Sequence, residues 1–114
     1  MSNLKLKAFH LSYDIKAIND KQYKKYKEKL LCTIKKTNPS NVYSPCASTI
    51  IIDYRIENKT DLIQVLNEEL NSRVFYFFIS AIKDDVENYF FYENNIDNSI
   101  FDNFKEEYNN LLCD

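Results

Sequence analysis

The sequence predicts an α+β domain, a ferredoxin-like split βαβ sandwich with an additional strand and helix at its C-terminal end. Two observations predict it: segments with the period of a strand alternate with segments at helical spacing, and 114 residues suffice for one core. No linker, repeat or low-complexity stretch divides the chain. We therefore expect a single domain over residues 1–114, with a ferredoxin-like core over 6–83 and an extension over 84–114.

The first predicted unit is a strand followed by a lysine-rich helix. Residues 7–15 alternate large apolar with small or polar side chains, and this strand ends at Asp14. Asn19 or Asp20 can cap the helix, because both side chains accept hydrogen bonds from free N–H groups of a first turn. Pro39 lacks an N–H group, so the helix must end before it.

The rest of the chain predicts further strands and helices in alternation. A helix-start signal, Asn-Lys-Thr-Asp, precedes an apolar stripe at helical spacing. The predicted strands are a short one over residues 42–44 that is broken at Pro45, a β-branched one over 48–56, an apolar one over 74–82 and a short one over 88–92. The predicted helices cover residues 58–70 and 99–112.

The strand over residues 74–82 is apolar on both faces. One row contains Phe75 and Phe77, and the other contains Tyr76 and Phe78. Exposure of either row would leave a large apolar patch, which soluble monomers rarely carry. We therefore expect a partner subunit or the C-terminal helix to cover the second face, and we predict a homodimer with Tyr76 and Phe78 at its interface.

Composition excludes several classes of protein. The chain has no glycine, so it lacks the glycine-rich loops of Walker-type and dinucleotide-binding sites. It shows no apolar run of membrane-spanning length and no secretory signal, so we expect no membrane partner. Cys32, Cys46 and Cys113 form neither a C-x-x-C pair nor a disulfide framework. We expect reduced cysteines and a cytoplasmic protein, with Cys32 in the core and Cys113 inert at a frayed end.

Charge is divided unevenly along the chain. Residues 1–40 carry a balance of +7, and residues 41–114 carry a balance of −9. The basic part includes the predicted first helix, which suggests a nucleic-acid-binding surface. A solvated lysine face is the alternative interpretation. The lysines concerned are Lys21, Lys24, Lys25 and Lys29.

Three polar residues are candidates for chemistry. Asp14, where the chain leaves the predicted sheet, can hold a metal or cap the turn that follows. Asp53 is a candidate second acid, or it faces solvent and pairs with a basic residue. His10, the single histidine, is expected to be a hydrogen-bonded sheet residue rather than a metal ligand.

Part of the sequence resembles a known family. The similarity rests on the strand Phe-His-Leu-Ser-Tyr-Asp14, the helix with Tyr23 and Tyr26, the segment 47–52 and the strand 74–82. Together they resemble the small CRISPR adaptation subunit, the ferredoxin-fold partner of the spacer integrase, and its solitary relatives. The resemblance covers about residues 6–83.

This resemblance implies a function. In that family each subunit of a dimer contributes the aspartate that closes the first strand, and a metal-dependent nuclease role is assigned to it. The matching residue is Asp14, as catalytic residue and as ligand of Mg²⁺ or Mn²⁺. We therefore expect a homodimeric nucleic-acid-binding protein of antiviral defence, with endonuclease activity left open. The alternative is a non-catalytic protein-interaction module or inhibitor encoded by a phage or mobile element.

Overall fold

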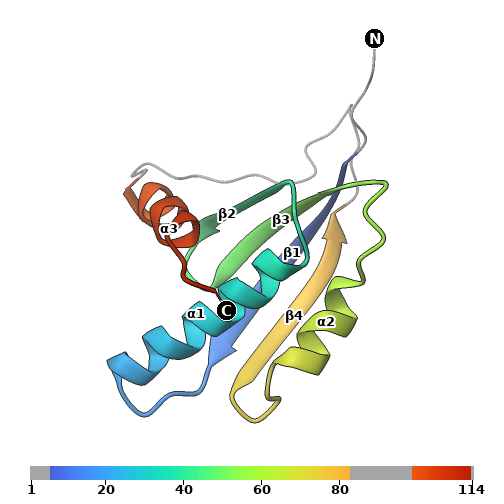
Figure 1. Ribbon diagram of the computed structural model, residues 1–114. Helices are drawn as coiled ribbons and strands as arrows, with labels where there is room; N and C mark the ends of the chain where they lie inside the picture. Colours follow the sequence, from blue (N-terminus) through green and yellow to red (C-terminus); the bar gives the residue numbers. More distant parts are fainter. Residues whose placement is uncertain (1–5, 83–98, 114) are drawn as a thin grey trace.

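A four-stranded antiparallel sheet forms the centre of the molecule (Figure 1). The structure, a computed structural model, describes residues 6–82 and 99–113. Their elements are β1 (Leu6–Ile15), α1 (Asp20–Lys36), β2 (Asn41–Cys46), β3 (Thr49–Arg55), α2 (Leu62–Glu69), β4 (Phe75–Ile82) and α3 (Ser99–Asn109). The strand order is β2-β3-β1-β4. This arrangement is compatible with the predicted ferredoxin-like α+β fold, whereas the predicted strand over 88–92 lies outside the described residues.

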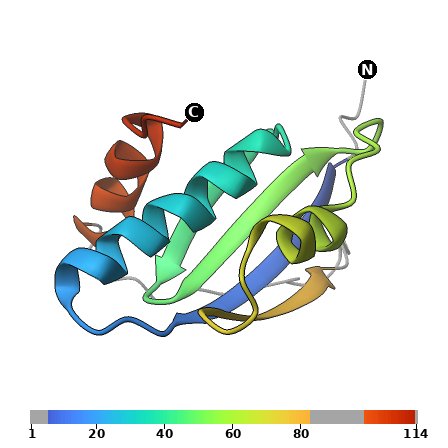
Figure 2. The same cartoon turned by 60° about the horizontal axis from the view of Figure 1, so that its bottom comes forward.

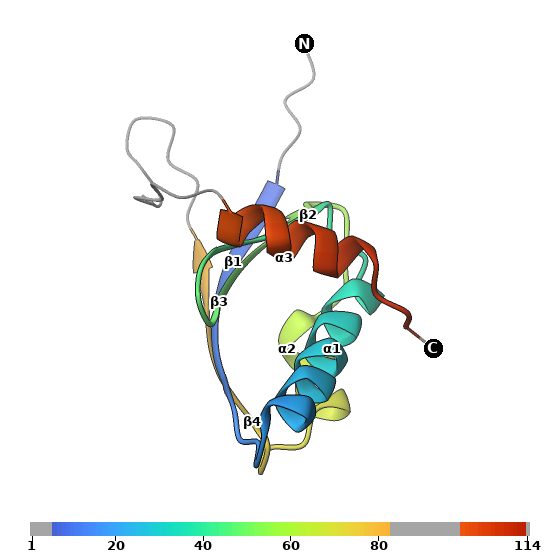
Figure 3. The ribbon, with the colours of Figure 1, turned by 90° about the vertical axis from the view of Figure 1, so that its left-hand side faces the viewer.

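All three described helices lie on the same side of the sheet. Figures 2 and 3 show α1 and α2 side by side over it, with α3 beside α1. The helix α3 packs against β2, the edge strand farthest from β4. The opposite face of the sheet therefore carries no described helix.

The core lies between the sheet and this helix layer. Its fully buried side chains come from β1, α1, β3 and α2: Leu11, Leu30, Leu31, Ile34, Ile50, Ile52, Tyr54 and Leu66. The Tyr54 hydroxyl lies 2.6 Å from the hydroxyl of Thr37, which donates to the carbonyl of Ile34. This pairing satisfies polar atoms that would otherwise destabilise a buried site.

The predicted cap of the first helix is confirmed. The Asn19 side chain accepts a hydrogen bond of 2.8 Å from the backbone N–H of Gln22. The Gln22 side chain in turn accepts one of 2.8 Å from the N–H of Ile18, so the helix entry is held from both sides. At the other end Asn38 has a φ of 59°, a conformation that asparagine tolerates better than most residues and that glycine would otherwise provide.

The prediction that Pro45 breaks the strand is wrong. β2 continues through it to Cys46, and the register shifts between Tyr43 and Cys46. An edge strand can accommodate proline because its outward positions need no ladder donor. The Ser44 hydroxyl lies 2.8 Å from the carbonyl oxygen of Cys46 and 2.7 Å from that of Thr49, which stabilises the irregular end.

The final helix docks onto the core, as its apolar stripe predicts. Phe104 is 4% exposed, and Tyr108 and Leu111 pack against the core cluster. Lys27 and Glu107 form an ion pair of 3.6 Å between α1 and α3. Because α3 lies on the helix side, it does not cover the second face of the sheet. Of the two covers expected from sequence, α3 is therefore excluded, and the partner subunit stays a prediction.

No helix of the described part of the chain is long and apolar enough to cross a membrane.

Candidate functional site

The sheet face opposite the helices contains the main candidate site, and we call it the outer face. It includes Ala8, His10, Ser12 and Asp14 of β1, Asn41 and Tyr43 of β2, Thr49, Ile51 and Asp53 of β3, and Tyr76, Phe78, Ser80 and Ile82 of β4. The register places Tyr76 opposite Asp14 and Phe78 opposite Ser12. In Figure 3, which views the sheet along its edge, the helices lie to one side of it and the outer face is on the other.

Two aromatic side chains project from this face. Tyr76 is 50% exposed and Phe78 is 67% exposed, whereas Phe75 of the other row is buried in the core. The alternation predicted for this strand therefore holds: one row packs under the helices and the other faces outward. Among the described residues no element covers Tyr76 or Phe78.

A hollow of about 450 Å³ lies at the end of the outer face where β1 leaves the sheet. Its side chains include one carboxylate, four hydroxyls and two aromatic rings, from Ser12, Asp14, Ser48, Thr49, Tyr76 and Phe78. Asp14 is exposed. The hollow can therefore accept a hydrogen-bond donor or a cation at Asp14 while an apolar group packs on Phe78.

Tyr13 borders the hollow beside Asp14, but most of its side chain lies on the other side of the sheet. The Tyr13 side chain points under the helices, where it is 7% exposed, and burial raises its pKa. The ring of His10 lies on the outer face, and its Nε2 is 2.9 Å from the Ser12 hydroxyl. His10 thus occupies the hydrogen-bonded sheet position expected from sequence.

The described part of a single chain does not complete a metal site at Asp14. Asp53, the candidate second acid, lies opposite Ala8, six residues along β1 from Asp14. At about 3.3 Å per residue this separation is about 20 Å, far beyond the reach of a shared ion. Burial raises the pKa of Asp53, and a hydrogen bond from Asn41 opposes that shift. Within the described ranges, no group of three His, Cys, Asp or Glu residues could hold a metal.

The four candidate nucleic-acid-binding lysines divide into two sets. Lys21, Lys24 and Lys25 are exposed on α1, and none forms an ion pair with a described residue. Lys29 instead lies 3.8 Å from Glu69 of α2.

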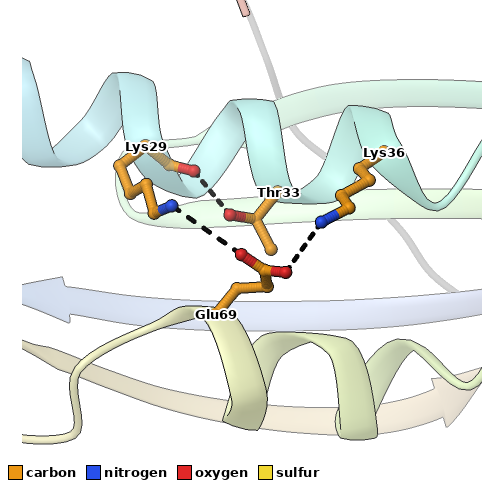
Figure 4. Close-up of polar contacts among 4 residues, drawn as sticks. All are labelled: Lys29, Thr33, Lys36 and Glu69. Carbon is orange, nitrogen blue, oxygen red and sulfur yellow. Dashed lines mark hydrogen bonds and ion pairs between the residues drawn. The ribbon is translucent and has the colours of Figure 1, made fainter. Parts of the chain in front are cut away.

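Figure 4 shows Lys29 and Lys36, about two turns apart on α1, converging on the Glu69 carboxylate. The Lys36 bond is 2.7 Å long, and its hydrogen bond and charge lower the pKa of Glu69. Lys29 is therefore part of a contact between α1 and α2. This contact could not be predicted from the sequence, because Lys29 and Glu69 lie far apart along the chain.

The expectation of reduced cysteines is wrong for two of the three. Cys32 of α1 and Cys113, which follows α3, form a disulfide across 81 positions of sequence. Cys113 is therefore not inert at a frayed end, and Cys46 is free and exposed. Sequence could not reveal this pairing, because it depends on α3 docking beside α1. Since such bonds are rare in the cytosol, the cytoplasmic location stays a prediction.

Sequence reasoning also missed the hydroxyls around Asp14. Side chains two residues apart in a strand lie on the same face, so the presence of Ser12 beside Asp14 could have been predicted from the sequence. Ser48 comes from the β2–β3 turn and Thr49 begins β3, and only the strand pairing brings them there.

Comparisons with known proteins found no match: no family model, no curated protein and no solved structure is similar to this chain.

Proposed function

We propose that this protein is a nucleic-acid-binding homodimer built on a ferredoxin-like sandwich, in which two copies associate through their outer faces. The observation that supports it is the exposure of Tyr76 and Phe78 on a sheet face that no described helix covers. Burial of such rings against a second copy removes apolar area from water, which favours association.

The size of the outer face is compatible with this dimer. The four strands have 10, 6, 7 and 8 residues, so at about 3.3 Å per residue and about 4.8 Å between strands they give roughly 500 Å² of projected area. Stable interfaces bury about 800 Å² per partner, and side-chain relief makes accessible area larger than projected area. A face-to-face dimer thus needs most of the outer face.

A charged substitution on this face tests the association. Phe78→Lys should convert a dimer to a monomer, because the interface would bury an unpaired ammonium group. Ile63→Lys is the matched control: Ile63 is 48% exposed but lies on α2, on the helix side. Light scattering should find a dimer for the control alone. A dimeric, folded Phe78→Lys variant would contradict an interface at the outer face.

The basic surface of α1 is the proposed nucleic-acid contact. In a dimer through the outer faces, the helix layer of each copy faces solvent, so Lys21, Lys24 and Lys25 stay accessible. The combined replacement of these three lysines by glutamine should weaken binding of an oligonucleotide and flatten its salt dependence, because fewer counterions are released. Lys59→Gln, at an exposed lysine outside α1, should leave the salt slope nearly unchanged.

Nuclease activity is the second candidate, and the strand register favours it. Asp14 lies directly opposite Tyr76, so a dimer that buries Tyr76 carries Asp14 of both copies into or beside the interface. Two carboxylates and bound water suffice for Mg²⁺ or Mn²⁺, which would stabilise the charge on a phosphate under attack. Among the described residues Asp53 lies too far from Asp14 to share an ion, so in this proposal the second carboxylate is Asp14 of the second copy.

The ion pairs of α1 favour the alternative, a non-catalytic interaction module or inhibitor from a phage or mobile element. Lys27, Lys29 and Lys36 all pair with carboxylates of α2 or α3, which reduces the basic charge offered to a nucleic acid. Failure of the native protein both to bind oligonucleotides in a salt-dependent manner and to cleave them would support this alternative over the first proposal.

A further inference from the structure

A second hollow, of about 310 Å³, lies on the helix side of the molecule, and the disulfide forms part of its wall. Its other lining residues come from α1 and α2: Lys29, Thr33, Lys35, Lys36 and Glu69. Figure 4 shows three of them, Lys29, Thr33 and Lys36, along one side of α1, with Glu69 below. We call it the disulfide hollow.

The disulfide is accessible from this hollow. Cys113 is exposed and Cys32 is partly exposed, so a reagent in the hollow can reach the bond, more readily on the Cys113 sulfur. Exchange requires such access, since the attacking thiolate must approach a disulfide sulfur directly.

The charges around the bond favour an anionic reagent. Among the described lining residues, three lysines carry positive charge and Glu69 alone carries a carboxylate. This excess of positive charge raises the local concentration of anions and stabilises a thiolate that leaves the bond.

We propose that the disulfide hollow is a thiol–disulfide exchange site for small anionic thiols, and that this exchange controls how firmly α3 is attached. A thiolate attacks the Cys113 sulfur and forms a mixed disulfide, while Cys32 leaves as a thiolate and takes up a proton. A second thiolate attacks the mixed disulfide on the reagent's sulfur and releases Cys113. Two thiols are oxidised to one disulfide, the protein gains two thiols, and the reverse sequence restores the bond.

Reduction removes the covalent cross-link between the end of α3 and α1, so α3 is then held against the core by non-covalent contacts. Phe104 stays in the core cluster, and Lys35 connects the hollow to α3 through a hydrogen bond of 3.3 Å from its ammonium group to the Tyr108 carbonyl. That ammonium also lies 5.3 Å from the centroid of the Tyr108 ring. With the covalent link broken, α3 can open locally without unfolding the sheet, so its attachment becomes weaker in a reducing environment.

The reduction rate tests the charge preference of the site. In a Cys46→Ser background, reduction by glutathione, which is anionic, is compared with reduction by cationic cysteamine. Each rate constant is corrected for the fraction of the reagent that is present as thiolate. It is then divided by the rate constant of the same reagent with a small uncharged disulfide. We expect glutathione to be favoured by about threefold or more at low salt, with the preference shrinking as salt screens the lysines. A ratio at or below one would overturn the proposal.

Two variants separate charge from structure. Lys36→Gln and Glu69→Gln both break the ion pair of Figure 4, so a structural effect would move the rate in the same direction in both. The proposal predicts opposite directions for the glutathione preference, lower in Lys36→Gln and higher in Glu69→Gln. Lys24→Gln, on α1 but outside the hollow, should leave it unchanged. Shifts of the same sign in the two variants would contradict a charge-selected site.

Hydrogen exchange tests the consequence for α3. Reduction should lower the protection of the amides within 99–109 several-fold, while β1 and β3 keep theirs. Unchanged protection of α3, or an equal loss throughout the sheet, would show that the bond does not control its attachment.

Discussion

Replacement of Phe104 by alanine measures how much α3 contributes to the core. Phe104 is 4% exposed in the core cluster, and its ring stacks on Tyr108 with 6.1 Å between ring centroids. Removal of a buried phenylalanine ring costs about 3–5 kcal/mol, because burial is lost and a cavity remains. For a domain of this size about 1 kcal/mol shifts the melting temperature by about 4 °C, so Phe104→Ala should lower it by more than about 12 °C.

Urea denaturation and thermal melting, followed by circular dichroism with the disulfide intact, provide the assay. Leu112→Ala is the matched control, because Leu112 follows the same helix but is 98% exposed. The control should change the free energy of unfolding by less than about 0.5 kcal/mol. If Phe104→Ala were no more destabilising than Leu112→Ala, α3 would not be part of the core.

Three further predictions concern the disulfide, a tyrosine and the candidate catalytic residue. Cys113→Ser should lower the free energy of unfolding by up to about 4.5 kcal/mol in non-reducing urea titrations, because the disulfide closes a loop across 81 positions of sequence. Cys46→Ser, which removes the free cysteine, should be nearly neutral. Equal effects of the two substitutions would refute the disulfide. Burial raises the pKa of Tyr108 from 10.0 to about 12, so its contribution to stability is complete below pH 10 and is lost as the pH rises toward 12. Urea titrations of Tyr108→Phe should therefore show a shallower alkaline decline, and superimposable curves would disprove the effect. In the native protein Mg²⁺ or Mn²⁺ should support cleavage of an oligonucleotide, and Asp14→Asn should abolish it with an unchanged melting curve; cleavage by the variant would exclude Asp14 as the catalytic residue.

Elements with strong local signals were predictable from sequence. The alternation around Leu11 and Tyr13 assigns those side chains to the core and Asp14 to the other face, as the strand pairing has it. The cap at Asn19 was readable because it depends on residues within one helical turn. The apolar stripe that includes Phe104 likewise predicted a docked final helix.

Features that depend on tertiary contacts were not predictable. The side of the sheet on which α3 lies decides both the disulfide of Cys32 with Cys113 and the uncovered outer face, and no local pattern specifies that side. The pairing of Lys29 with Glu69 depends on the packing of α1 beside α2. The charge of the sequence therefore predicted more unpaired lysines on α1 than the structure has. Pro45 was misjudged because only the sheet order reveals that its strand is at an edge.

The proposed association of two copies through the outer face is tested most directly by the mass of the protein in solution. Sedimentation equilibrium of the Cys46→Ser protein, which cannot cross-link through that thiol, is followed over a dilution series from tens of micromolar downward. We predict a species of twice the 13.6 kDa of one chain, dissociating only on dilution. A mass of 13.6 kDa at every concentration would contradict the dimer and the metal site that depends on it.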